Sequence, residues 1–160
     1  MTTEETPDSP GIHFPPPIAY VVPLALGFLA YRWWPVGIVP AQYRPLLATI
    51  GWLLVLATVI LLLPAYVAFL RARTSLLPHR PARAIVQSGH YRWTRNPMYI
   101  AITALCVGVA CVFNALWPLL LVPVSVVFTD RYIIPREEAY LERAFGAEYV
   151  AYKRRVPRWF

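Results

Sequence analysis

Four long apolar segments dominate this sequence and limit the folds that are open to it. They cover residues 18–34, 46–70, 97–113 and 116–134, and 58% of the 160 residues are hydrophobic. A soluble domain of this length cannot bury so much apolar surface, so the excess faces lipid. The second segment would be about 37 Å long as a helix, enough to cross a bilayer with some tilt. We therefore predict an all-α, polytopic membrane protein with four transmembrane helices.

The basic residues indicate how these helices are oriented. Thirteen of the fifteen Lys and Arg residues lie in two groups, Arg71 to Arg95 and Arg131 to Arg158, and only Arg32 and Arg44 come earlier. Basic residues beside membrane spans mark the cytoplasmic face, so both groups and both chain ends are expected there. Such flanking charge favours contact with anionic membrane lipids over contact with nucleic acid.

The segments outside the spans carry patterns of their own. Residues 1–17 are acidic and proline-rich, which predicts a disordered tail and not a secretory signal. Residues 18–160 are predicted to form a single domain, with a long polar loop over residues 71–96, the last part of which is residues 84–96. After Pro135, apolar and aromatic residues recur at helical spacing, which predicts a separate C-terminal helix over residues 136–154. Its aromatic face and nearby basic residues are typical of a helix that lies along the cytoplasmic membrane surface.

Two polar clusters fall at the same end of the hairpin made by the third and fourth spans. Each cluster has a structural interpretation of its own. Asn96 and Pro97 are well suited to begin a helix, and Arg95 can serve as a positive anchor. Glu137 and Glu138 can complement a helix dipole. Together, however, the two clusters can hold a polar, charged small molecule against the bilayer.

The remaining polar residues are less informative. Asp130 and Arg131 lie near the inner end of the fourth span, where an ionisable pair is either functional or a structural ion pair. His90 is a candidate general base, but no carboxylate or nucleophile at a telling spacing supports it. Cys106 and Cys111 are interpreted as buried free thiols, and no metal is expected from these cysteines and three scattered histidines. The seven glycines form no nucleotide-binding motif, which excludes a soluble-type dinucleotide or methyl-donor domain.

The two clusters also carry a resemblance to a known family. The pattern Gly89-x-Tyr91-x-x-x-Arg95-Asn96-Pro97-Met98-Tyr99, followed by Glu137-Glu138-x-x-Leu141-x-x-x-Phe145-Gly146-x-Glu148-Tyr149-x-x-Tyr152, resembles the isoprenylcysteine carboxyl methyltransferase and phospholipid methyltransferase superfamily. These are integral membrane enzymes that use S-adenosylmethionine. The resemblance covers residues 84–159. It departs from the family at Asn96, where histidine is common, and at Ala101, where glycine is usual.

The resemblance implies binding of S-adenosylmethionine and release of S-adenosylhomocysteine. Arg95 and Glu138 are the implied catalytic residues: Arg95 would hold the carboxylate of the donor, and Glu138 with Glu137 would take its ribose or amine. Aromatic packing near the sulfonium is implied for Tyr91 or Tyr99. The rest of the implied cofactor-binding set is Gln87, Gly89, Asn96 and Pro97, of which Gln87, Gly89 and the loop backbone would read the adenine edge.

The implied acceptor is lipophilic, and it enters sideways from the bilayer. An isoprenylcysteine-like carboxylate, a phospholipid amine or a similar small lipophile all fit, and no protein partner is required. Two other interpretations stay open. One is an NADPH-dependent membrane reductase of the sterol-reductase type, which has a similar Arg-x-Pro-x-Tyr region, although the Glu137-Glu138 pair counts against it. The other is a non-enzymatic membrane module.

Overall fold

The computed structural model describes residues 11–12, 14–71 and 84–160, and every regular element within them is a helix. The long elements are α1 (Ile18–Trp33), α2 (Arg44–Arg71), α3 (Pro97–Val112), α4 (Leu116–Phe128), α5 (Ile134–Phe145) and α6 (Ala147–Arg155). Between them lie two 3₁₀ turns, η1 (Ala41–Tyr43) and η2 (Gly89–Arg92), and a π-helical segment, η3 (Thr129–Ile133). The predicted all-helical fold class is confirmed for this part of the chain.

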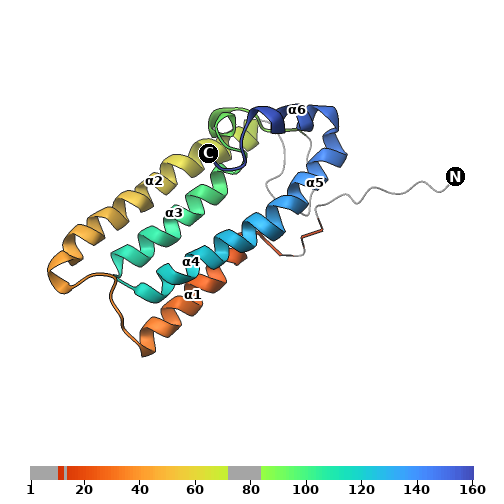
Figure 1. Cartoon of the computed structure of the whole chain (residues 1–160). Coiled ribbons are helices and arrows are strands. Elements are labelled where there is room, and N and C mark those ends of the chain that lie inside the picture. The colour runs from red at the N-terminus through yellow and green to blue at the C-terminus, as the bar shows by residue number, and fades with distance from the viewer. Residues whose placement is uncertain (1–10, 13, 72–83) are drawn as a thin grey trace.

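The four long apolar helices run antiparallel and lie side by side (Figure 1). α2 packs on α3, α1 packs on α4, and α3 also contacts α4. Short connections, residues 34–43 and 113–115, join the helices at one end of this bundle. The segment 84–96, α5, α6 and the last residues of the chain gather at the other end. The two polar clusters of the sequence therefore meet at one end of the bundle.

The outer surface of the bundle is apolar, as expected of a protein in lipid. On α2, for example, Trp52 is 61% exposed and Leu63 is 60% exposed. Within the described residues, two helices are long and apolar enough to cross a membrane, Ala41–Arg71 and Leu116–Phe145. Ile18–Trp33 and Pro97–Val112 are apolar but shorter, and 16 residues span only about 24 Å. Four crossings therefore stay a prediction.

Small residues allow the helices to approach closely. A Cβ atom on Gly108 of α3 would lie 2.8 Å from the carbonyl oxygen of Gly51 on α2, and a Cβ on Gly51 would lie 2.7 Å from that of Gly108. On the other pair, a Cβ on Gly27 of α1 would lie 2.4 Å from Cα of Pro118 on α4. Close backbone contact through small residues is how membrane helices gain packing energy when lipid removes the hydrophobic driving force.

Asn114 forms the tight turn between α3 and α4. Its φ angle is +49°, a left-handed value that asparagine tolerates better than most residues. Its side-chain oxygen accepts hydrogen bonds from the backbone N–H groups of Ile38 and Val39, both at 2.9 Å. Its amide donates to the carbonyl oxygen of Val39 at 3.0 Å. One buried side chain thus joins both short connections at this end of the bundle.

The sequence prediction of a fourth span ending at 134 and a separate helix over 136–154 is wrong in two respects. The helix that begins at Leu116 continues through η3 into α5, because Ile134 N–H bonds to the carbonyl of Thr129 in a wider π turn. Pro135 then lies in the first turn of α5, directly after this π turn. The break comes at Gly146 instead, whose φ of +53° ends α5 and separates it from α6.

The aromatic face of the C-terminal region turns inward rather than toward lipid. Tyr149 and Tyr152, each 3% exposed, form a buried cluster with Val156. Ile85 of the segment 84–96 packs against that cluster, and the Tyr152 hydroxyl donates to the backbone carbonyl of Tyr91 at 2.8 Å. The predicted contact of this face with the membrane surface is therefore wrong, because the face is already covered by protein.

The predicted disordered tail is only partly within the described residues, since residues 1–10 and 13 lie outside them. The part that is described packs against the bundle. Ile12 is 3% exposed, and the ring of Phe14 stacks on that of Phe128 with centroids 6.2 Å apart. The ordered domain thus begins before residue 18.

We predict that Gly108→Val destabilises the protein by about 1–3 kcal/mol, because the added side chain overpacks the contact with Gly51. Ala25→Val adds a similar volume at an exposed position of α1 and serves as the matched control. Thermal unfolding of both variants in the same detergent measures the effect. Equal melting temperatures for the two variants would show that the α2–α3 contact can relax freely.

Candidate functional site

The site is built at the start of α3, where the chain leaves the segment 84–96. Arg95 extends a side chain that is 10% exposed, and its neighbours Thr94 and Asn96 are buried. Pro97 occupies the first turn of α3, as predicted, but the Asn96 side chain makes no capping hydrogen bond. Its amide donates instead to the backbone carbonyl of Arg158 at 3.0 Å. The simple helix-start interpretation of Asn96 therefore accounts for the proline and not for the asparagine.

Glu138 is the centre of a buried ion cluster. Its side chain is 8% exposed and receives Arg95 Nη1 at 2.7 Å. Arg158 approaches from the other side with Nη2 at 2.8 Å and Nε at 3.2 Å, and Lys153 Nζ lies 3.9 Å away. A carboxylate removed from water is tolerated only when it is paired and hydrogen-bonded, and this one has three cations. Arg95 is thus a partner of Glu138 and not merely a positive anchor.

The last part of the chain forms what we call the C-terminal strap, residues 157–159. Its backbone crosses the start of α3: Arg95 N–H donates to the carbonyl of Pro157 at 3.0 Å, and the Thr94 hydroxyl donates to the carbonyl of Arg158 at 3.0 Å. Its side chains reach η3, where Arg158 Nη1 and Trp159 Nε1 bond to Asp130 at 3.2 Å and 2.9 Å. The strap connects the two polar clusters of the sequence.

The strap also decides between the two interpretations of Asp130. The carboxylate pairs with Arg131 at 3.4 Å, with Arg158 and with the indole of Trp159. The cross-element ion pair is therefore present, and its role is to seat the strap. Sequence reasoning missed Arg158 and Trp159, because a basic residue near a membrane span has an orienting role by default. The only sequence signal was the pair of aromatic and basic residues directly after Pro157.

Glu137 has a different environment from its neighbour Glu138. It is half-buried, and its carboxylate accepts a hydrogen bond from the Tyr99 hydroxyl at 2.9 Å. Within the described residues, no Lys or Arg side chain forms an ion pair with it. The nearby Arg136 is turned away, with its guanidinium 3.6 Å from the centroid of the Tyr132 ring. The two adjacent carboxylates thus differ in their partners: Glu138 is paired with cations, and Glu137 is bound, among the described residues, only by the phenol of Tyr99.

The remaining predicted site residues lie around α6 and α2. Gln87 bonds to Glu148 at 3.3 Å and to Arg155 at 2.7 Å. Tyr91 is buried and its ring lies 5.6 Å from that of Phe69. Gly89 is exposed, and its φ of +61° gives the chain its turn into η2. Gln87 and Tyr91 are therefore engaged with other partners, whereas Gly89 shapes the turn.

The ionisation of the groups in this layer follows from burial and from the Glu138 cluster. Burial raises the pKa of the Tyr149 phenol to about 12, and the negative Glu138 acts in the same direction. Burial also raises the pKa of Tyr152 and of Tyr91. The hydrogen bond with Glu138 raises the pKa of the Arg158 guanidinium. These phenols therefore stay protonated donors at neutral pH, and Arg158 stays charged.

Two buried polar atoms in this region have no hydrogen-bond partner among the described residues, Arg95 Nε and His90 Nε2. A buried guanidinium N–H without an acceptor is costly. Arg95 keeps this donor free although its Nη1 is held by Glu138. Arg95 therefore has one N–H donor that no acceptor among the described residues satisfies.

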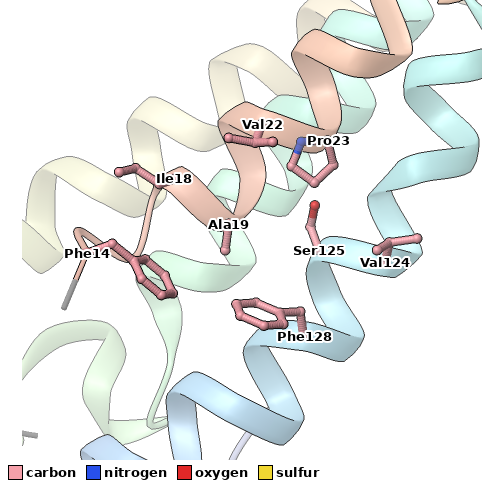
Figure 2. A pocket seen from close by; sticks show the side chains of 8 residues that line it. All are labelled: Phe14, Ile18, Ala19, Val22, Pro23, Val124, Ser125 and Phe128. Atoms are coloured by element: carbon pink, nitrogen blue, oxygen red, sulfur yellow. The ribbon is translucent and has the colours of Figure 1, made fainter. Parts of the chain in front are cut away.

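An apolar groove of about 340 Å³ lies between α1 and α4, on the side of the bundle (Figure 2). Ser125 is the one polar side chain in its lining, and its hydroxyl points into the space between the helices. The groove is lined by Phe14, Ile18, Ala19, Val22, Pro23, Val124, Ser125 and Phe128. Phe128 is followed directly by η3, which carries Asp130, so the groove ends close to the polar end of the bundle.

Comparison with known proteins matches the sequence of this chain to one family. The sequence model for phospholipid methyltransferase matches residues 46–148, well over half of the chain. The chain belongs to the phospholipid methyltransferase family. No curated protein and no solved structure matches. The match runs from α2 to the start of α6 and includes both polar clusters, so it confirms the resemblance seen in the sequence. It favours a membrane methyltransferase that acts on lipid-like substrates over the reductase and the non-enzymatic module.

We predict that Arg158→Gln lowers the free energy of unfolding by about 1–3 kcal/mol, since it removes charged hydrogen bonds from both Glu138 and Asp130. Arg154→Gln removes an equal charge from an exposed position of α6 and is expected to change stability by about 0.5 kcal/mol or less. Thermal unfolding in detergent at matched ionic strength measures both. Equal effects of the two substitutions would mean that the strap does not hold the site together.

Proposed function

We propose that the protein transfers a methyl group from S-adenosylmethionine to a lipophilic acceptor. The observation that carries this proposal is the buried Arg95, held by Glu138 through Nη1 while its Nε has no partner among the described residues. Family membership supplies the general reaction class. The cofactor and its place in the chain are our inference from the chemistry of the residues present.

The residues fit the polar groups of this donor. The free Nε of Arg95 suits the donor carboxylate, and Glu138 keeps the guanidinium in place. Glu138 suits an ammonium or a ribose hydroxyl. Of the two tyrosines implied by the resemblance, Tyr99 is the better placed for the sulfonium. The Tyr91 ring packs on Phe69, and the Tyr91 backbone carbonyl accepts a hydrogen bond from Tyr152 of α6. Gln87, Gly89, Asn96 and Pro97 form the wall that the segment 84–96 and the start of α3 would offer to the adenine.

When bound, the donor supplies an electrophilic methyl group on a sulfonium. The chain's own task is then to orient the two reactants and exclude water. The strap and the aromatic cluster of α6 cover the start of α3, which supports exclusion of water. The apolar groove between α1 and α4 would take the hydrocarbon part of the acceptor, since its outer edge belongs to the apolar surface of the bundle.

We predict that Arg95→Ala and Glu138→Gln each weaken S-adenosylmethionine binding by about ten- to a hundred-fold, because each removes a charge-assisted contact. Arg92→Ala and Glu142→Gln are the matched controls, since Arg92 is exposed and Glu142 pairs with Lys153. Calorimetry on the purified proteins measures the affinities. Unchanged affinity in both site variants would leave Arg95 and Glu138 with a structural role only.

The same proteins allow a direct test of the reaction. Incubation with donor carrying a tritiated methyl group and a total lipid extract should place label in a lipid product. Labelled lipid that depends on Arg95 supports the proposal. Stabilisation by NADPH and not by S-adenosylmethionine would favour a reductase, and stabilisation by neither would favour a non-enzymatic module.

We also propose that the protein crosses the membrane four times with the site facing the cytoplasm, because thirteen of the fifteen basic residues belong to the sequence segments 71–95 and 131–158. Ser88→Cys places a thiol beside the site, and Gln42→Cys places one in η1 at the opposite end. Both positions are exposed, and the native Cys106 and Cys111 are buried. An impermeant maleimide added to intact cells should label residue 42 rapidly and residue 88 only after lysis. The reverse order would refute this orientation.

A further inference from the structure

We propose that Glu137, together with Tyr99, accepts the proton that the acceptor must lose before it is methylated. This inference rests on the proposed function, and it assigns the two adjacent carboxylates to different tasks. Glu138 is neutralised by Arg95, Arg158 and Lys153. Glu137 has only the Tyr99 hydroxyl, at 2.9 Å, among the described residues. A carboxylate already bound by three cations is a poor base, whereas one bound only by a neutral phenol is free to take a proton.

The charged and titratable groups around Glu137 come from several elements. On its own helix, Glu138 adds negative charge and Arg136 is turned onto the Tyr132 ring. From α3 it faces Tyr99, and from η2 the buried phenol of Tyr91. On the strap and α6, Arg158 and Lys153 are engaged with Glu138. The neighbouring cations are thus committed to other groups.

The position of Tyr99 brings this pair toward the apolar groove. Tyr99 packs against a buried cluster of Tyr20, Cys106 and Val122, and Ala19 of the groove lining packs against the same cluster. Thr103 holds this region together: its hydroxyl donates to the backbone carbonyl of Tyr99 at 2.7 Å and lies 3.1 Å from the Tyr20 hydroxyl oxygen. A single buried cluster therefore links Tyr99, and through its hydroxyl Glu137, to the lining of the groove from which an acceptor with hydrocarbon chains would come.

The chemistry restricts the acceptor to a nitrogen or oxygen that carries a proton, for which an ammonium headgroup is the simplest case. The Glu137 carboxylate takes one N–H proton, and the electron pair of that bond stays on nitrogen as a lone pair. That lone pair forms the new N–C bond with the methyl group, and the electron pair of the broken C–S bond stays on the sulfur of the sulfonium donor. Glu137 then returns its proton to water. A carboxylate acceptor has no proton to lose at neutral pH and would not need Glu137.

The test compares wild type, Glu137→Gln, Glu137→Asp, Tyr99→Phe and the control Glu142→Gln. Each is placed in vesicles of phosphatidylethanolamine and phosphatidylcholine with tritiated donor, and single-turnover transfer is measured from acid to alkaline pH. We expect Glu137→Gln to lose about 100-fold or more in rate near neutral pH, with smaller losses for Glu137→Asp and Tyr99→Phe. The deficit should shrink at alkaline pH, where the amine loses its proton to water without help. A purely structural defect would not be relieved in this way.

Two readouts do not depend on turnover. Calorimetry should give Glu137→Gln a donor affinity within a few-fold of wild type. Infrared spectra of protein carrying ¹³C-labelled glutamate, recorded from acid to alkaline pH, should show one carboxyl that loses its proton at a higher pH than the others in wild type and in Glu142→Gln, and this signal should be absent in Glu137→Gln. A loss of rate that is equal at all pH values, full activity of Glu137→Gln, or methylation of carboxylate lipids alone would each overturn the inference. Failure of wild type to bind the donor would refute the proposed function as well.

Discussion

The burial of one carboxylate, that of Glu138, determines the arrangement of the polar end of this protein. Removing a charge from water is expensive, and here the cost is offset by cations from three separate segments. Arg95 comes from the start of α3, Lys153 from α6 and Arg158 from the C-terminal strap. The start of α3 is far from the other two segments in the sequence, so the carboxylate fixes its position against them. Glu138 holds Nη1 of the Arg95 guanidinium, while the Nε of Arg95 has no partner among the described residues.

The helices of the bundle are held together by interactions of a different kind from those at the polar end. Lipid removes the hydrophobic drive for helices to associate, so close packing and a few polar contacts have to replace it. Gly51 and Gly108 bring α2 and α3 into backbone contact, and the Thr58 hydroxyl donates across the same interface to the carbonyl of Ala101 at 3.1 Å. The bundle is thus a rigid base, and it delivers the start of α3 and the end of α4 to one place.

Much of the fold could be predicted because it depends on local patterns. Apolar runs of fixed length predicted the first three long helices to within two residues and the start of the fourth, and the Asn114 turn and the Pro97 helix start reflect residue preference. The clusters at Arg95 and Glu138 could be brought together because short connections force neighbouring helices to be antiparallel. The π turn at η3 could not be predicted, since it depends on how the chain accommodates Pro135 inside a continuous helix. The inward orientation of Tyr149 and Tyr152 could not be predicted from the sequence either, because an aromatic helix face packs as well on protein as on lipid.

The position of the strap depends on the length of α6. Its contacts with Thr94, Arg95 and Asn96 are made through the backbone carbonyls of Pro157 and Arg158, so they do not read the side chain at position 157. They depend instead on the number of residues between the strap and Gly146, which directly precedes α6. One residue more or fewer in α6 would turn the strap by about 100° and shift it by about 1.5 Å, and Arg158 could no longer reach both Glu138 and Asp130. α6 therefore acts as a spacer. Substitutions on its exposed side should be tolerated, whereas insertion of a residue should not.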